Sequence, residues 1–344
     1  MTENPPTFKE WQELYKFAIC LKQNKPWEWM TEVDIFGVQN PKTDEIGFVS
    51  VMGMADEHYA VAVYMGSEGL YGFWDLQDAG PHDHAERLLE IPQLQASFED
   101  RDSLDQKDYD IIKKLGLKFR GRHAWPMFRT YRPGLLPWFM EAEEARFMIC
   151  VLEQTLDVAL RYSEDETLLE TLSDEKYLVR VPHKEDSTLA WGDSIIHVPP
   201  PEPPDIQIFL NAEEIKALKL LPQSTHTIEI DFFMLPATIG EKGTRGFWAY
   251  TLLMVDSKTG LIVGNESLIA DPSLEAMWGS IPDKVVHQLS RAGTVPKEIR
   301  VRSELLLQLL NPLAVELRLK LKQTRTLQML SSVREILLRH LRYD

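Results

Sequence analysis

One short segment decides how this chain of 344 residues divides into folding units. The segment reads VPPPEPPD, residues 198–205, and five of the six residues 199–204 are proline. Proline has a fixed φ and no backbone N–H, so the run favours a stiff, extended spacer over a helix or a central strand. A chain of this length also exceeds one typical hydrophobic core. We therefore predict an N-terminal domain (1–198), a proline-rich linker (199–205) and a C-terminal domain (206–344).

Charge is distributed unevenly between the two predicted domains. The chain has 37 basic and 53 acidic side chains. Residues 224–344 contain 15 basic and 13 acidic side chains, which leaves 22 basic and 40 acidic side chains for residues 1–223. An acidic body of this kind repels phosphate backbones, so general binding of nucleic acid is disfavoured for the protein as a whole. We expect the partner to be another protein.

The sequence also indicates where the protein resides. No apolar run approaches the roughly 18 residues of a membrane helix, and the N-terminus MTENPPTFKEW lacks the pattern of a secretory signal. Cys20 and Cys150, the only cysteines, are too few for a disulfide framework or a cysteine-based zinc site. They suit a reducing compartment. We predict a cytoplasmic protein without a membrane association.

The N-terminal domain mixes helical and strand patterns. Phe8, Trp11, Leu14, Tyr15 and Ala18 recur at helical spacing. The acidic run at 99–110 is typical of a solvated loop and a helix start. The predicted helices span 8–23, 86–89 and 140–162, and the predicted strands span 33–40, 47–54, 59–66, 176–182 and 194–200. This mixture predicts an α+β domain.

The C-terminal domain has a more regular order. After a short helix at 211–221 come three strand-like runs, at 227–237, 246–256 and 261–270. Asp271-Pro272 is predicted to start a helix that reaches Gly293 with a kink at Pro282. Strand, helix, strand and helix then follow at 298–302, 303–310, 317–323 and 326–342. We predict an α/β domain with a mixed five-stranded sheet and helical crossovers.

This order resembles a ribonuclease H-like domain, most closely the transposase and retroviral integrase branch. In that branch a first strand bears an aspartate, which matches Asp231 in IEIDFF. The second acid follows the fourth strand, where this chain has Ser303 and then Glu304. Two-metal chemistry needs several carboxylates around Mg²⁺. The low-ranking metal candidates are Asp231, Glu304 and Glu275, and the favoured interpretation of Asp231 is a buried, hydrogen-bonded residue.

Asp256 lies in LLMVDSKTGLIVGNES, residues 252–267, and could be either a catalytic carboxylate or a turn residue. Aspartate followed by glycine between two apolar runs is typical of a hairpin turn. In the resembled topology this turn lies at the opposite end of the sheet from the active centre. We therefore predict that Asp256 is a turn residue.

Basic and aromatic residues alternate in KFRGRHAWPMFRTYRPGLLPWF, residues 118–139. Such mixing can stack bases or anchor a peptide, or its arginines can pair with the acidic surroundings while its rings fill a core. Although we favour the structural interpretation, this is the best candidate binding surface. The candidate residues are Arg120, Arg122, Trp125, Arg129, Tyr131 and Arg132. His82, Asp83 and His84 form an H-x-H pattern in a Gly-Pro loop without a third ligand, which indicates a polar loop.

The whole chain resembles a bacterial two-domain family of unknown function. The resemblance rests on PWEWM, FGVQNPKTDEIGFVSVMG and YAVAVYMGSEGL in the first domain, and on RGFWAYTLLMVDSKTGLIVG and VPKEIRVRSELLLQLLNPLA in the second. It implies a bacterial, cytoplasmic protein and no particular activity. We predict a non-catalytic interaction or scaffold protein without a cofactor. The alternatives are a metal-dependent nuclease with a rearranged, Mg²⁺-binding carboxylate site and a nucleic-acid-binding module.

Overall fold

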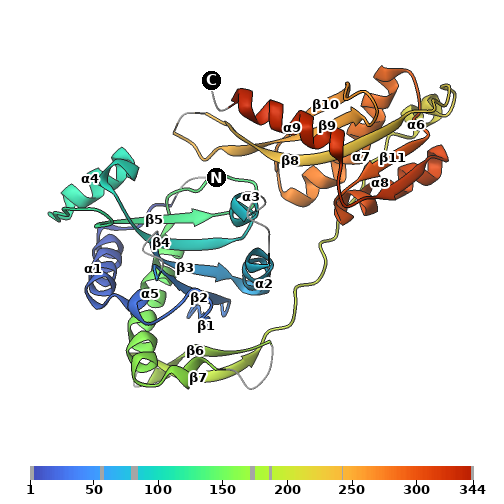
Figure 1. The fold of residues 1–344 in the computed structure, drawn as a ribbon. Coiled ribbons are helices and arrows are strands. Elements are labelled where there is room, and N and C mark those ends of the chain that lie inside the picture. Colours follow the sequence, from blue (N-terminus) through green and yellow to red (C-terminus); the bar gives the residue numbers. More distant parts are fainter. Residues whose placement is uncertain are drawn as a thin grey trace. The chain divides into compact units, whose positions relative to one another are not determined.

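The computed structural model describes residues 4–54, 58–78, 84–170, 175–185, 188–241 and 243–341. The chain forms two compact units (Figure 1). The N-terminal unit comprises the residues up to Arg132 together with Pro137–Glu202. The C-terminal unit comprises Pro133–Leu136 and the chain from Pro203 onward. In the described part of the chain, every helix is too short or too polar to cross a bilayer.

The described part of the N-terminal unit is built on a seven-stranded sheet with the order β5-β4-β3-β2-β1-β6-β7. Neighbouring strands from β5 to β1 are antiparallel, β1 pairs with β6 in parallel, and β6 and β7 form an antiparallel pair. The strands are β1 (Phe36–Gln39), β2 (Ile46–Met52), β3 (Tyr59–Met65), β4 (Gln93–Glu99), β5 (Trp125–Tyr131), β6 (Lys176–Glu185) and β7 (Thr188–His197).

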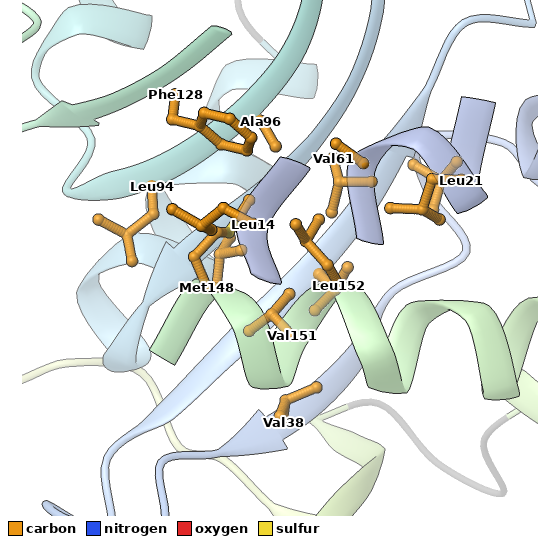
Figure 2. Packing of buried hydrophobic residues seen from close by; sticks show 14 of the residues in the cluster. Leu14, Leu21, Val38, Val61, Leu94, Ala96, Phe128, Met148, Val151 and Leu152 are labelled. Atoms are coloured by element: carbon orange, nitrogen blue, oxygen red, sulfur yellow. The ribbon is translucent and has the colours of Figure 1, made fainter. Parts of the chain in front are cut away.

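Helices cover both faces of this sheet because its central strands are apolar on both sides. The larger core joins one face to α1 (Phe8–Asn24) and α5 (Ala142–Glu164), as Figure 2 shows for Leu14, Val61, Met148 and Leu152. The smaller core joins Phe48 and other residues of the opposite face to α2 (Gly66–Gln77). The remaining described helices are α3 (His84–Leu89), α4 (Gln106–Lys114), η1 (Pro26–Glu28), η2 (Arg101–Ser103) and η3 (Glu166–Leu169).

The ends of α1 are set by local chemistry. At its start, Thr7 and Glu10 form a capping box, in which each side chain accepts a hydrogen bond from the other residue's backbone N–H. At its end, Lys25 adopts a left-handed conformation with φ 51°, and its N–H donates to the Leu21 carbonyl at 2.8 Å. The last turn therefore presents Lys22 and Lys25 close to the start of η1.

The predicted strands of this unit are found, although the sheet is larger than expected. Strand β4 was not predicted, and β5 was predicted as part of an arginine–aromatic segment whose rings fill a core, but not as a strand. The acidic run at 99–110 does contain a helix start, α4, but the expectation that it is solvated is wrong at Asp108, which is buried beneath Arg129. An ion pair with a strand 21 residues later explains this burial.

The described part of the C-terminal unit has a mixed five-stranded sheet, as predicted, with the order β10-β9-β8-β11-β12. Strands β8 (Thr227–Ile239), β9 (Phe247–Asp256) and β10 (Ile262–Leu268) are antiparallel, whereas β11 (Glu298–Val301) pairs in parallel with both β8 and β12 (Lys320–Gln323). The helices are α6 (Ala212–Leu218), α7 (Leu274–Ala292), α8 (Glu304–Leu317) and α9 (Gln328–Leu341).

Two details correct or extend the expected helices of this unit. Helix α7 begins later than predicted, because Ser273 is its N-cap and its hydroxyl accepts from the Ala276 N–H at 3.3 Å. Leu330 of α9 and Leu327, the residue before this helix, pack on the sheet in a cluster that contains Phe233 and Leu253. The Leu330 N–H also donates to the buried Glu229 carboxylate at 2.8 Å.

Candidate functional site

Three of the six residues proposed from the arginine–aromatic stretch are tied into the N-terminal unit. Arg129 is 6% exposed and forms a bidentate pair with Asp108, at 3.0 and 2.6 Å, with Asp105 at 3.1 Å. Burial lowers the pKa of Arg129, but the hydrogen bonds and charge of Asp108 outweigh burial and raise it. The Tyr131 hydroxyl donates to the Gln95 side chain at 2.9 Å.

Arg132 is the third of these residues. Its guanidinium lies 2.9 Å from Glu144 and 3.6 Å from Glu141, both at the start of α5. Burial lowers the pKa of Arg132, and the contacts to Glu144 and Glu141 raise it overall. Arg129, Tyr131 and Arg132 thus hold β5 to its neighbours in the sheet, to α4 and to α5.

The other three proposed residues lie at the start of β5 and before it, near the surface. The Arg122 side chain is 84% exposed, and its ion pair within the described ranges is a long contact of 3.8 Å to Asp100. Trp125 packs edge-on against Tyr109 and Phe119, with ring centroids 5.9 and 5.8 Å apart. Arg120 and Trp125 line a cavity of about 710 Å³ beside α4, whereas Arg122 lines a different cavity.

This second cavity, of about 480 Å³, brings together residues that are distant in sequence. We call it the basic cavity. The described residues that line it are Lys22, Lys25, Trp27, Glu28, Gly53, Met54, Tyr59, Arg122 and His123. Among these residues, only Arg122 was proposed from the sequence. The segments KQNKPW and RGRHAW are each basic and aromatic, but only the fold shows that Arg122 and His123 of the second segment line the same cavity as Lys22, Lys25 and Trp27 of the first.

A third cavity, of about 490 Å³, is acidic. Its wall includes Asp34, Tyr162, Glu166 and Glu170. The Tyr162 hydroxyl donates to Asp34 at 3.1 Å. Burial, the charge and hydrogen bond of Asp34, and the charges of Glu166 and Glu170 raise the pKa of Tyr162 to about 12. The Tyr162 hydroxyl therefore stays protonated and acts as a donor at neutral pH.

The low-ranking metal candidates lie in the C-terminal unit. Asp231 is 5% exposed; its carboxylate accepts from the Phe232 N–H at 3.1 Å and lies 3.5 Å from the Arg302 guanidinium. Glu304 is exposed in the first turn of α8, and Glu275 is half-buried in the first turn of α7. Within the described ranges, no three His, Cys, Asp or Glu side chains come together in a way that could hold a metal ion.

The H-x-H pattern cannot be placed. His82 and Asp83 lie outside the described residues, and of His84 the structure describes only the backbone, at the start of α3.

Asp256 closes the turn between β9 and β10, as predicted. Its buried carboxylate accepts from the backbone N–H groups of Lys258 and Thr259 at 3.1 and 2.8 Å. A further partner, which the sequence pattern does not indicate, is His226, whose Nδ1 lies 2.6 Å from the carboxylate. Burial would raise the pKa of Asp256, but the hydrogen bonds from His226, Thr259 and Lys258 outweigh it and hold the pKa well below its usual range.

We expect this turn to make the free energy of unfolding decrease at acid pH. Because the folded pKa of Asp256 is depressed, its contribution is present above the unfolded pKa of about 4 and is lost as pH falls below that value. Asp256→Ala should lower the free energy of unfolding by about 1–3 kcal/mol at pH 7. Urea denaturation at pH 7 and pH 3 measures the effect, and the gap between wild type and variant should narrow at pH 3. A gap that widens at pH 3 would contradict the assignment.

Comparison with known families adds two matches. Residues 11–180 match a domain of unknown function (DUF7309), and residues 214–338 match another domain of unknown function (DUF6930). No curated protein matches the chain. The first match lies within the N-terminal unit apart from the short segment at 133–136, and the second lies within the C-terminal unit. The chain is therefore a two-domain protein that pairs two domains of unknown function.

Proposed function

We propose that this is a non-catalytic interaction protein whose C-terminal unit is a ribonuclease H-like domain that has lost its metal site. The strand order β10-β9-β8-β11-β12, with three antiparallel strands followed by two parallel ones, supports this fold assignment. Helices α7 and α8 provide the crossovers between β10, β11 and β12. The order matches the topology that the resemblance implies.

The observation that carries the proposal is the pairing of Asp231 with Arg302. In the resembled branch, the first-strand aspartate holds a divalent cation with the help of other acids. Here a guanidinium 3.5 Å from the carboxylate supplies the positive charge instead. A second carboxylate of β8, Glu229, is occupied by the Leu330 N–H at the start of α9. Both acids of this strand thus have structural partners.

We infer that the partner is another protein and that the chain works in a bacterial cytoplasm. The excess of acidic over basic side chains in residues 1–223 supports a protein over a polynucleotide, because it repels phosphate backbones. Cys20 and Cys150 are both free thiols, which supports a reducing compartment. Capture of the tagged intact chain from its native cell should enrich one protein in near-stoichiometric amount; enrichment of nucleic acid alone would contradict this inference.

A metal titration tests the loss of the catalytic site. Mg²⁺ and Mn²⁺ are titrated calorimetrically into the wild-type chain, Asp231→Asn and a control, Asp271→Asn, which alters an exposed acid of the same unit. We expect no saturable binding with a Kd below about 1 mM in any of the three. We also expect no metal-dependent cleavage of single- or double-stranded oligonucleotides. Binding or cleavage that is lost in Asp231→Asn and retained in Asp271→Asn would establish the nuclease alternative.

A further inference from the structure

The basic cavity is unusual in its surroundings. Residues 1–223 carry 40 acidic against 22 basic side chains, yet among the described residues the wall of this cavity contains Lys22, Lys25 and Arg122 against one carboxylate, Glu28. Its cations come from two separate parts of the fold. Lys22 and Lys25 stand at the end of α1, and Arg122 lies in the segment that leads into β5. Positive charges that converge in an acidic domain indicate a site for an anion.

Internal partners leave part of this charge without compensation. The Lys25 ammonium pairs with Glu28 at 2.8 Å, but within the described part of the chain the ion pair of Arg122 is the long 3.8 Å contact to Asp100. The Lys22 ammonium lies over the rings of Trp27 and Tyr59, at 5.3 and 4.6 Å from their centroids, and no ion pair is recorded for it among the described residues. Burial and then the charge of Lys25 lower the pKa of Lys22. An anion between these groups would relieve that repulsion.

Two residues in the wall of the cavity have a strained backbone conformation. Lys25 and His123 are left-handed, with φ of 51° and 49°, a conformation that is costly for residues other than glycine. His123 is held by its N–H, which donates to Asp100 at 2.7 Å, and its ring packs edge-on against Tyr59 with centroids 5.4 Å apart. Trp27 lies 5.0 Å from Tyr59. Strain held in place by packing is typical of preformed ligand sites.

We propose that the basic cavity binds the phosphate group of a small organic phosphate such as a mononucleotide. Arg122 presents a planar, permanently charged guanidinium group to the phosphate oxygens. Lys22, from a distant segment of the chain, adds a second cation to the same cavity. The volume of about 480 Å³ lies within the range of small-ligand sites. A long polyanion fits less well, because it would extend from the cavity across the acidic surface of the same unit. This site is independent of the function proposed for the C-terminal unit.

Calorimetry on the intact chain tests the proposal with adenosine 5′-monophosphate, inorganic pyrophosphate and uncharged adenosine as probes. We expect both phosphates to bind and adenosine to bind at least about tenfold more weakly, because it lacks the charge-assisted hydrogen bonds. Arg122→Gln should weaken binding of the monophosphate about tenfold or more. Its matched control is Arg120→Gln, an exposed arginine two residues away that lines the other cavity and should leave binding unchanged.

Several outcomes would overturn the proposal. The first is a Kd above about 1 mM for either phosphate. The second is an equal affinity for adenosine and its monophosphate. The third is an equal loss of monophosphate affinity in Arg122→Gln and Arg120→Gln. A ten-nucleotide oligothymidylate that binds more tightly than the monophosphate, and depends on Arg122, would replace the small ligand by a single strand. Because the Arg122 side chain is 84% exposed, its replacement leaves the core intact, and circular dichroism verifies that the variant is folded.

Discussion

Replacing Arg129 by alanine is expected to lower the free energy of unfolding of the N-terminal unit by about 3–5 kcal/mol. The change removes both hydrogen bonds to Asp108, which is 3% exposed and would be left as an uncompensated charge in the interior. The pair lies next to the main core: burial first, and then the charge of Asp108, raise the pKa of the Tyr15 hydroxyl. Urea denaturation at pH 7, with hydrogen exchange to assign the transition to this unit, measures the loss.

Two further variants separate the ion pair from general effects of losing an arginine. Arg122→Ala removes a side chain of the same type from an 84% exposed position and should change stability by no more than about 0.5 kcal/mol. The double variant Arg129→Met with Asp108→Leu removes both charges and should regain most of the lost stability, since the cost arises from the stranded carboxylate. If Arg129→Ala were as stable as Arg122→Ala, the buried pair would have no structural importance.

The buried ion pair of Arg129 and Asp108 helps to explain why the sequence predicts some strands of the N-terminal unit and misses others. Strands β2 and β3 are continuous apolar runs, which identify themselves as buried strands. Strand β5 contains Pro126 and the buried Arg129, which local patterns assign to a loop and to the surface. Burial of the Arg129 guanidinium is tolerated because the Asp108 carboxylate pairs with it in the folded chain. Information of this kind is not present in any local window of sequence.

Strand β4 was missed for a related reason. Its residues alternate between Leu94, Ala96 and Phe98 on one side and Gln93, Gln95 and Ser97 on the other, and both sides are buried. On the polar side, Gln93 donates to the Leu88 carbonyl and Gln95 accepts from the Tyr131 hydroxyl, whereas the buried Oε1 of Gln93 has no hydrogen-bond partner among the described residues. In the C-terminal unit, by contrast, β8 and β9 are largely buried apolar runs, and α7 and α8 each begin at a serine N-cap, so the sequence predicts the order of these elements.

The candidate sites were less predictable than the elements. Charge and aromatic content drew attention to residues 118–139, but the fold divides that stretch between a buried network around Arg129 and two separate cavities. The basic cavity needs Lys22 and Tyr59, which no motif connects to Arg122. The role of Asp256 in its turn was predictable because turn chemistry is local, whereas its contact with His226 spans 30 residues.

Replacing Leu152 by alanine is expected to lower the free energy of unfolding of the N-terminal unit by about 2–5 kcal/mol, through lost burial and the cavity left behind. Leu152 is 0% exposed on α5 and belongs to the cluster that joins this helix to α1 and the sheet (Figure 2). The surrounding side chains come from several elements, so the space can close only in part. Urea denaturation at pH 7, with hydrogen exchange to identify the amides that lose protection, measures the loss.

The same helix supplies the matched control for this change. Leu160 also lies on α5 but is 51% exposed, so Leu160→Ala has the same chemistry and the same helix propensity without the loss of core. It should change stability by no more than about 0.5 kcal/mol. The difference between the two variants therefore measures burial alone, and equal effects at Leu152 and Leu160 would mean that α5 is not the central support of this sheet.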